Sequence, residues 1–156
     1  MAHISFSELL AWNDCPHKHK LIYVDKIRSF FGNEFTAFGK SVHDVCEKAL
    51  LDESIDMNTT FLSYMDKEKV SLEKKGYEID QKFWGVLKEQ GTSLTSFILP
   101  SVKNYFGNYE VISTEEQIFE PTGIDDEYNF KGFIDLVVKT EDGKYHIIDW
   151  KTCSWG

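Results

Sequence analysis

Features of membrane-bound and secreted proteins are scarce in this sequence of 156 residues. No run approaches the roughly 20 apolar residues that a membrane-spanning helix needs. The segment 1–7 has neither the basic start nor the apolar core of a signal peptide. The three cysteines, Cys15, Cys46 and Cys153, lie far apart and form no Cys-x-x-Cys pair. We therefore expect no disulfide framework, and the sequence favours a reducing compartment such as the cytoplasm.

Positive charge is also scarce. Lys and Arg number 17 against 26 Asp and Glu, which gives a formal net charge of −9. This balance argues against a broad basic surface for nucleic acid. A metal site would tolerate the acidic residues, because a bound cation reverses the local field. One basic cluster is either a contact for phosphates or a solvated helix face; its members are His17, Lys18, His19, Lys20, Lys26 and Arg28.

Apolar residues are plentiful enough for a core. Hydrophobic residues make up 42% of the chain and aromatic residues 15%, and the length fits one domain. Periodicity predicts helices over 6–13, 16–24, 35–51, about 58–75, 78–90 and 92–106, and strands over 111–120, 130–139 and 145–152. Gly91 is expected to end the fifth helix. We predict an α/β domain over 1–156, with a helical insertion at 56–108 and an antiparallel three-strand sheet.

The last two predicted strands form a hairpin whose register decides which side chains meet. Asp142-Gly143 marks the turn between them. A two-residue loop would place Asp135 and Asp149 on opposite faces of the sheet. A three-residue loop over 141–143 puts Gly143 in the left-handed region and places Asp135 opposite Asp149. We predict the second register, in which one hard cation bridges two carboxylates that are about 5 Å apart and would otherwise repel each other.

Asp135 and the motif Asp149-Trp150-Lys151 have the composition of a phosphodiesterase metal site. They supply two carboxylates for a divalent cation and place an ammonium group beside them. The alternative is a plain hairpin with surface acids, because a short charged triplet is common by chance. The Gly132-x-x-Asp135 strand at the right distance favours the metal site.

The predicted helix 35–51 carries a second group of candidate ligands. Gly39, His43 and Glu47 recur at every fourth position and share one side of the helix. His43 and Glu47 can point at one ion, or His43 can be a partly buried histidine in a salt bridge to Glu47. On the spacing alone, the salt bridge is the preferred interpretation.

Four stretches, taken in order, resemble the RecB-like, CRISPR-associated exonuclease-like branch of the PD-(D/E)XK nuclease superfamily. Ile4–Pro16 is similar to the opening Ser-x-Ser helix that ends in Cys-Pro. Phe38–Glu47 is similar to the Gly-x-x-x-His-x-x-x-Glu helix. Gly132–Asp135 matches the Gly-x-x-Asp strand, and Ile147–Thr152 matches the Asp-x-Lys-Thr strand. Each motif alone is unspecific, but four in this order are hard to produce by chance.

The resemblance implies a restriction-endonuclease-like core and a role for each site residue. Lys151 would orient or deprotonate the attacking water, and Glu47 would support the site. Mg²⁺ or Mn²⁺ would lower the pKa of bound water and stabilise the pentacovalent phosphate. On this resemblance His43 is expected to be a ligand rather than a structural histidine. The implied metal ligands are His43, Asp135, Asp149 and, through its backbone carbonyl, Trp150.

The sequence departs from the family pattern near its end. The family has a Gln-x-x-x-Tyr helix shortly after Asp-x-Lys, whereas this chain stops at Ser154-Trp155-Gly156, so the last core helix and strand are absent. We therefore expect the chain to be the front part of a longer domain. Iron–sulfur members also begin with Cys-Pro, and Cys15 occupies that position. A [4Fe–4S] cluster would need ligands beyond residue 156, because Cys46 and Cys153 lack the required spacing.

The function expected from the resemblance is metal-dependent DNA cleavage by an exonuclease, in recombination, repair or phage DNA metabolism. The expected partners are DNA and a helicase or recombination protein, in the cytoplasm of a bacterial cell or phage-infected host. The alternative is a catalytically inactive nuclease-like module that binds DNA or a helicase. The metal ligands and Lys151 favour the enzyme, whereas the acidic charge and the missing helix favour the module.

Overall fold

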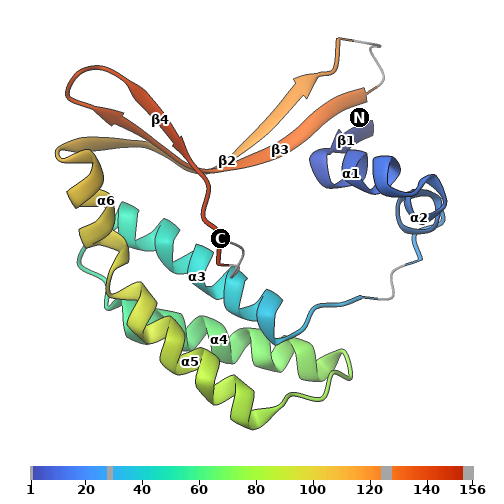
Figure 1. Ribbon diagram of the computed structural model, residues 1–156, viewed down its shortest axis with the longest axis horizontal. Helices are drawn as coiled ribbons and strands as arrows, with labels where there is room; N and C mark the ends of the chain where they lie inside the picture. Colours follow the sequence, from blue (N-terminus) through green and yellow to red (C-terminus); the bar gives the residue numbers. More distant parts are fainter. Residues whose placement is uncertain (1, 28–29, 124–127, 153–156) are drawn as a thin grey trace. The chain divides into compact units, whose positions relative to one another are not determined.

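The computed structural model describes residues 2–27, 30–123 and 128–152, and the chain divides into two compact units (Figure 1). Unit 1 comprises Met1–Phe30 and Glu115–Ile134, and unit 2 comprises Phe31–Thr114 and Asp135–Gly156. Within the described ranges, each helix is too short or too polar to cross a bilayer.

Unit 2 is built on helices whose starts are fixed by polar side chains. The Asn33 side chain accepts the Thr36 N–H at 3.0 Å, and Thr36 Oγ1 accepts the Asn33 N–H at 2.8 Å. Asp56 and Asp80 cap the next two helices in the same way. These caps satisfy backbone donors that the helices leave unpaired. The four helices are α3 (Glu34–Leu51), α4 (Met57–Lys74), α5 (Gln81–Thr95) and α6 (Ile98–Phe106).

Four strands form one sheet: β1 (Ala2–Ser5), β2 (Tyr109–Pro121), β3 (Tyr128–Thr140) and β4 (Tyr145–Ile148). The order is β1–β3–β2, and β4 also pairs with β3. The prediction of three antiparallel strands is corrected here, because β1 adds a fourth strand that runs parallel to β3. With only four residues, β1 is too short for alternation to reveal it from sequence. The predicted mixed α/β class is confirmed.

The predicted three-residue hairpin loop is confirmed. Thr140 N–H donates to the Lys144 carbonyl at 2.9 Å, and Gly143 has φ of +80°. The ladder pairs Lys139 with Tyr145 and, at its far end, Leu136 with Ile148. Gly143 tolerates the left-handed conformation that this loop requires. The ladder ends one residue before Asp135 and Asp149, so the direct pairing of these two residues stays a prediction.

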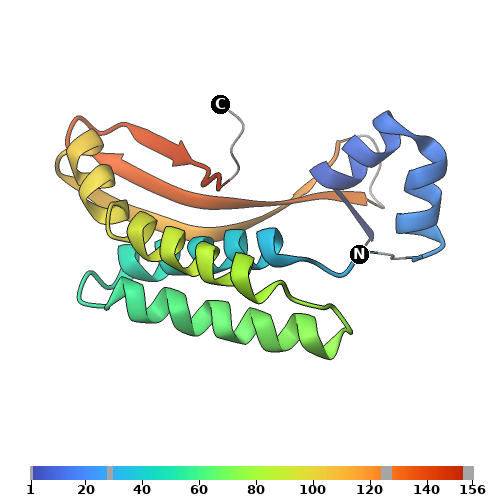
Figure 2. The ribbon, with the colours of Figure 1, turned by 60° about the horizontal axis from the view of Figure 1, so that its bottom comes forward.

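Two buried clusters hold unit 2 together, and its helices lie on one side of its strands (Figure 2). The first joins α3, α4 and α5, where the Phe38 and Phe61 rings meet edge to face at 5.9 Å between centroids. The second joins α3 and α6 to β3 through four buried side chains, Leu50, Val102, Leu136 and Val138. The side chain of Trp150 packs against both clusters. The helices and the hairpin are therefore tied to the same core.

The expected helix end at Gly91 is wrong, because α5 continues through Gly91 to Thr95. A Cβ built at Gly91 would lie 1.9 Å from Cζ of Phe61 in α4. The glycine therefore serves close packing of α4 against α5 rather than helix termination. Together α4, α5 and α6 occupy the segment 56–108 that was predicted to be helical.

Unit 1 contains three short helical segments next to β1. Ser5 Oγ accepts the Glu8 N–H at 3.2 Å and caps the first of them, as its sequence predicts. Pro16 occupies the first turn of the second, where its missing N–H costs nothing. The segments are α1 (Phe6–Asp14), α2 (Pro16–His19) and the π-helical turn η1 (Lys20–Val24).

A buried carboxylate links the start of α3 to the α4–α5 connection. Tyr77 hydroxyl donates to Glu34 Oε2 at 2.5 Å, and Asp80 N–H donates to Glu34 Oε1 at 3.1 Å. Burial by itself raises the pKa of Glu34. Hydrogen bonds from Tyr77 and from the Glu34 and Asp80 backbone outweigh it, so the pKa lies below its ordinary value.

Replacing Tyr77 with phenylalanine is expected to lower the urea midpoint at pH 7 by roughly 0.5–1 M, since a charged acceptor loses its donor. The lowered pKa of Glu34 means that this contribution is present above the ordinary carboxyl value of 4.5 and is lost as the pH falls through the folded value. The difference between the two midpoints should therefore shrink as the pH is lowered from 7 toward 3. Tyr64→Phe, at a ring that packs on the same core, is the control and should change little at either pH. An unchanged difference at pH 3 would contradict this account.

Candidate metal centre

A histidine on α3 and an aspartate on β3 meet in unit 2. His43 Nδ1 lies 3.6 Å from Asp135 Oδ2, and the two side chains are 28% and 13% exposed. Buried Val42 anchors α3 beside His43, and fully buried Leu136 anchors β3 beside Asp135. Two donor atoms at this separation fit a shared cation, because ligands about 2.1 Å from Mg²⁺ lie roughly 3–4 Å from each other.

The carboxylate partner of His43 is Asp135 rather than Glu47. The interactions of the described residues include no hydrogen bond or ion pair between His43 and Glu47, although Glu47 follows one turn later and is half-buried. The helical salt bridge that the spacing favoured is therefore wrong. Helical periodicity cannot reveal this, because the competing carboxylate comes from a strand far along the chain.

Beyond Ile148 the chain leaves the strand ladder. The predicted strand to residue 152 is therefore too long, and β4 ends at Ile148. The next contact is different in kind, since Trp150 N–H donates to the Asp135 carboxylate, Oδ2, at 2.7 Å. This hydrogen bond satisfies a backbone donor that the ladder leaves unpaired and orients Asp135 toward His43.

Asp149 and Lys151 form an exposed ion pair beside this contact. Lys151 Nζ lies 2.6 Å from Asp149 Oδ2, and the Asp149 side chain is 60% exposed. In this structure the negative charge of Asp149 is balanced by the ammonium group of Lys151. The structure thus brings His43, Asp135 and the Trp150 amide together and places the Asp149–Lys151 pair next to them in sequence.

Two features hold the Asp-x-Lys segment against α3. The Trp150 side chain is fixed between the two buried clusters, while its neighbours Asp149 and Lys151 are exposed. A Cβ at Gly39 would lie 3.0 Å from Thr152 Oγ1. Gly39, one turn before His43, therefore leaves room for the end of this segment.

Glu115 on β2 has an unusual backbone conformation that the sequence analysis missed. Its φ of +47° lies in the left-handed region, which is uncommon for a residue other than glycine and recurs at functional sites. Glu115 and Glu116 are adjacent acids, so the sequence alone does not single out either of them.

The cysteines differ in their chemistry. Burial, and then the charge of Asp135, raise the pKa of Cys46 to about 12, so this thiol is a poor source of thiolate. Cys15 is exposed and free, and its assignment as an iron–sulfur ligand stays a prediction. Cys153, and the predicted end of the chain at 154–156, lie outside the described residues.

The comparison with known families agrees with this arrangement. The sequence matches the PD-(D/E)XK nuclease superfamily over residues 3–155. No curated protein matches the sequence. Because the family match covers almost the whole chain, the superfamily predicted from the four motifs is confirmed. The chain belongs to the PD-(D/E)XK nuclease superfamily, whose members are metal-dependent nucleases.

Proposed function

We propose that this protein is a Mg²⁺- or Mn²⁺-dependent deoxyribonuclease of the RecB-like branch, and that it acts as an exonuclease in DNA recombination, repair or phage DNA metabolism. DNA is the proposed substrate, and a helicase or recombination protein is the proposed partner. The observation that supports this most is the approach of His43 Nδ1 to Asp135 Oδ2 at 3.6 Å, within a chain of this superfamily.

In this proposal His43 and Asp135 would hold the ion, and the Trp150 carbonyl would be a further ligand. Asp149, which pairs with Lys151 in this structure, would also bind the ion, and the Lys151 ammonium would serve the attacking water and the phosphate. Glu47, one turn after His43 on α3, would support the site. A bound divalent ion would supply Lewis acidity, lowering the pKa of its water and stabilising charge on the phosphate.

Metal titration tests the assignment of the ligands. Asp135→Ala is expected to weaken Mn²⁺ binding tenfold or more, and His43→Ala less, because carboxylate charge supplies most of the affinity for a hard cation. Asp135→Asn should also lose binding while keeping an acceptor for the Trp150 amide. Asp66→Ala removes an exposed carboxylate from a salt bridge to Lys88 and is the control. Equal calorimetric affinities in all these proteins would show that the site lies elsewhere.

Cleavage then separates the enzyme from the inactive module. The wild-type protein is expected to degrade linear DNA with Mg²⁺ or Mn²⁺ and to stop when EDTA is added. Shortening from the ends, rather than internal nicking of a closed circle, identifies an exonuclease. Binding of DNA and Mn²⁺ without any degradation would instead establish a nuclease-like binding module.

A further inference from the structure

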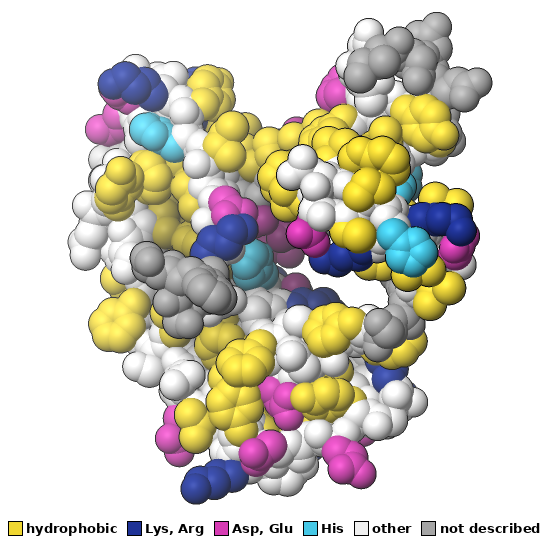
Figure 3. All heavy atoms as spheres, turned by 45° about the vertical axis from the view of Figure 1, so that its right-hand side comes forward, with side chains coloured by type: hydrophobic (Ala, Val, Ile, Leu, Met, Phe, Trp, Pro, Cys, Tyr) yellow, Lys and Arg dark blue, Asp and Glu magenta, His cyan; other side chains and the backbone are white. Residues whose placement is uncertain are grey.

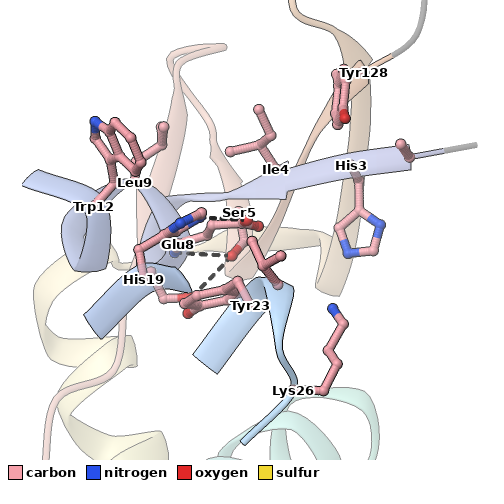
Figure 4. Close-up of a pocket in the computed structure, with 13 residues that line it drawn as sticks. His3, Ile4, Ser5, Glu8, Leu9, Trp12, His19, Tyr23, Lys26 and Tyr128 are labelled. Atoms are coloured by element: carbon pink, nitrogen blue, oxygen red, sulfur yellow. Dashed lines mark hydrogen bonds and ion pairs between the residues drawn. The ribbon is translucent and has the colours of Figure 1, made fainter. Parts of the chain in front are cut away.

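Unit 1 contains an open pocket of about 1020 Å³ between β1, the short helices and Tyr128 of β3 (Figure 4). This volume is at the upper end of the range for small-molecule sites, which is roughly 300–1,000 Å³. All of its lining residues belong to unit 1, and the candidate metal ligands His43, Asp135 and Asp149 are not among them. The pocket is a concave site separate from the residues proposed for the nuclease chemistry.

One wall of the pocket is a fixed set of aromatic rings. The His19 ring stacks on the Tyr23 ring with centroids 5.3 Å apart and planes inclined by 19°. The Trp12 ring meets His19 edge-on at 5.2 Å. Glu8 Oε1 lies 3.0 Å from His19 Nε2, and Tyr23 hydroxyl donates to Ser7 Oγ at 3.4 Å. These contacts orient the rings before any ligand arrives, which reduces the ordering cost of binding.

The opposite wall carries positive charge. Figure 4 shows Lys26 extending toward the side of the pocket where His3 lies, across from Tyr23. Lys26 has φ of +58°, and its ammonium has no ion-pair partner among the residues that the structure describes. Glu8 is the acidic group that lines the pocket, and His19 faces it. An anionic ligand therefore meets Lys26 without displacing a carboxylate.

The charge balance of residues 1–30 differs from that of the whole chain. The first 30 residues contain four Lys and Arg, three Asp and Glu and three of the five histidines, whereas the chain carries a net charge of −9. On the face shown in Figure 3, Lys and Arg side chains lie apart among acidic and hydrophobic ones. Attraction of a polyanion is thus a local property of this segment and not of a broad basic surface.

We propose that the unit 1 pocket binds one unpaired nucleotide of single-stranded DNA. The base stacks on the Tyr23 ring, and the adjoining phosphate faces Lys26 and His3. A planar ring surface with a cation across from it matches the two parts of a nucleotide, and every base offers a π-face, so the recognition tolerates any sequence. A base in a duplex must leave its stack to enter, which favours single strands and frayed ends. The choice of DNA rests on the proposed nuclease function.

Binding of fluorescein-labelled (dT)₁₂ by the metal-free protein in EDTA tests the proposal, with anisotropy as the readout. The wild type is expected to bind (dT)₁₂ at least tenfold more tightly than a blunt 12-base-pair duplex or free thymidine monophosphate.

Tyr23→Ala should weaken binding about tenfold, and Tyr23→Phe should retain it, because stacking needs the ring and not the hydroxyl. Lys26→Gln should weaken binding several-fold and reduce its salt dependence by about one phosphate contact. Tyr105→Ala, at an exposed tyrosine of α6, is the matched control and should bind as the wild type does.

The outcomes for the pocket and for the nuclease are distinguishable. Wild-type affinity in both Tyr23→Ala and Lys26→Gln overturns the pocket proposal, even if DNA is still cut with Mn²⁺. Equal affinity for thymidine monophosphate and (dT)₁₂ also overturns it, since the site would then serve a free nucleotide. Tyr23-dependent binding of (dT)₁₂ in EDTA, together with no DNA cleavage when Mg²⁺ or Mn²⁺ is added, supports the pocket proposal and refutes the nuclease proposal.

Discussion

Replacing Lys151 with alanine is expected to slow DNA cleavage on the order of a hundredfold or more while leaving Mn²⁺ affinity nearly unchanged. The ammonium is not a metal ligand, and its proposed contacts form with the attacking water and the phosphate during the reaction. The present partner of Lys151 is Asp149, whose side chain is 60% exposed and stays solvated when the lysine is removed. The fold should therefore tolerate the change, and the loss should appear in kcat rather than in DNA binding.

Lys144→Ala is a closely matched control for this experiment. Lys144 pairs with Asp142 two residues before it, as Lys151 does with Asp149, and both pairs are solvent-exposed in the same hairpin region. Cleavage by Lys144→Ala should stay within about twofold of the wild type, because surface ion pairs contribute little. Similar losses in the two variants would show that Lys151 acts through the hairpin and has no role at the reacting phosphate.

The largest expected effect on stability comes from Gly91→Ala in α5. The new methyl group would lie 1.9 Å from Phe61 Cζ and 2.2 Å from Cε1, and Phe61 is fully buried against Phe38. The ring has no open space to move into, so overpacking should cost about 1–3 kcal/mol, more than the gain in helix propensity of roughly 1 kcal/mol. Urea unfolding should show a clearly lower midpoint.

Gly85→Ala in the same helix should have the opposite sign. A Cβ at Gly85 meets no atom within 4 Å, so the substitution only improves helix propensity, by roughly 0.5–1 kcal/mol. In the double variant Phe61→Leu with Gly91→Ala, leucine leaves room for the new methyl group. The loss of unfolding free energy should therefore be smaller than the sum of the losses in the two single variants, because the two residues are in contact. Additive effects, or a midpoint of Gly91→Ala at or above that of the wild type, would contradict the packing account.

Elements specified by neighbouring residues were predictable from the sequence. The hairpin is an example: Asp142-Gly143 and the alternating apolar residues on both sides determine the loop and the register within about 15 positions. Ser5 and Pro16 mark helix starts for similarly local reasons. The order of the four motifs indicated the superfamily because each motif can be read from a short stretch of the sequence.

Contacts between distant segments were not predictable in this way. Gly91 resembles a helix stop until Phe61, on another helix, is placed against it. His43 has an acid one turn away, yet its partner Asp135 comes from a strand. The backbone conformation of Glu115 has no sequence signature, and the end of β4 depends on the Asp135 carboxylate accepting the Trp150 amide. In each case a tertiary contact overrides the local preference.

The parallel pairing of β1 with β3 has a consequence for the order of folding. Ala2 pairs with Tyr128 and Ser5 with Lys131, so β1 waits for a partner that is synthesised 126 positions later. The helices α3, α4 and α5 contact one another over much shorter separations and have no such delay. Closing the long loop between β1 and β3 costs entropy before any contact repays it. During translation, β1 therefore stays without its β3 partner until residues 128–131 have been made.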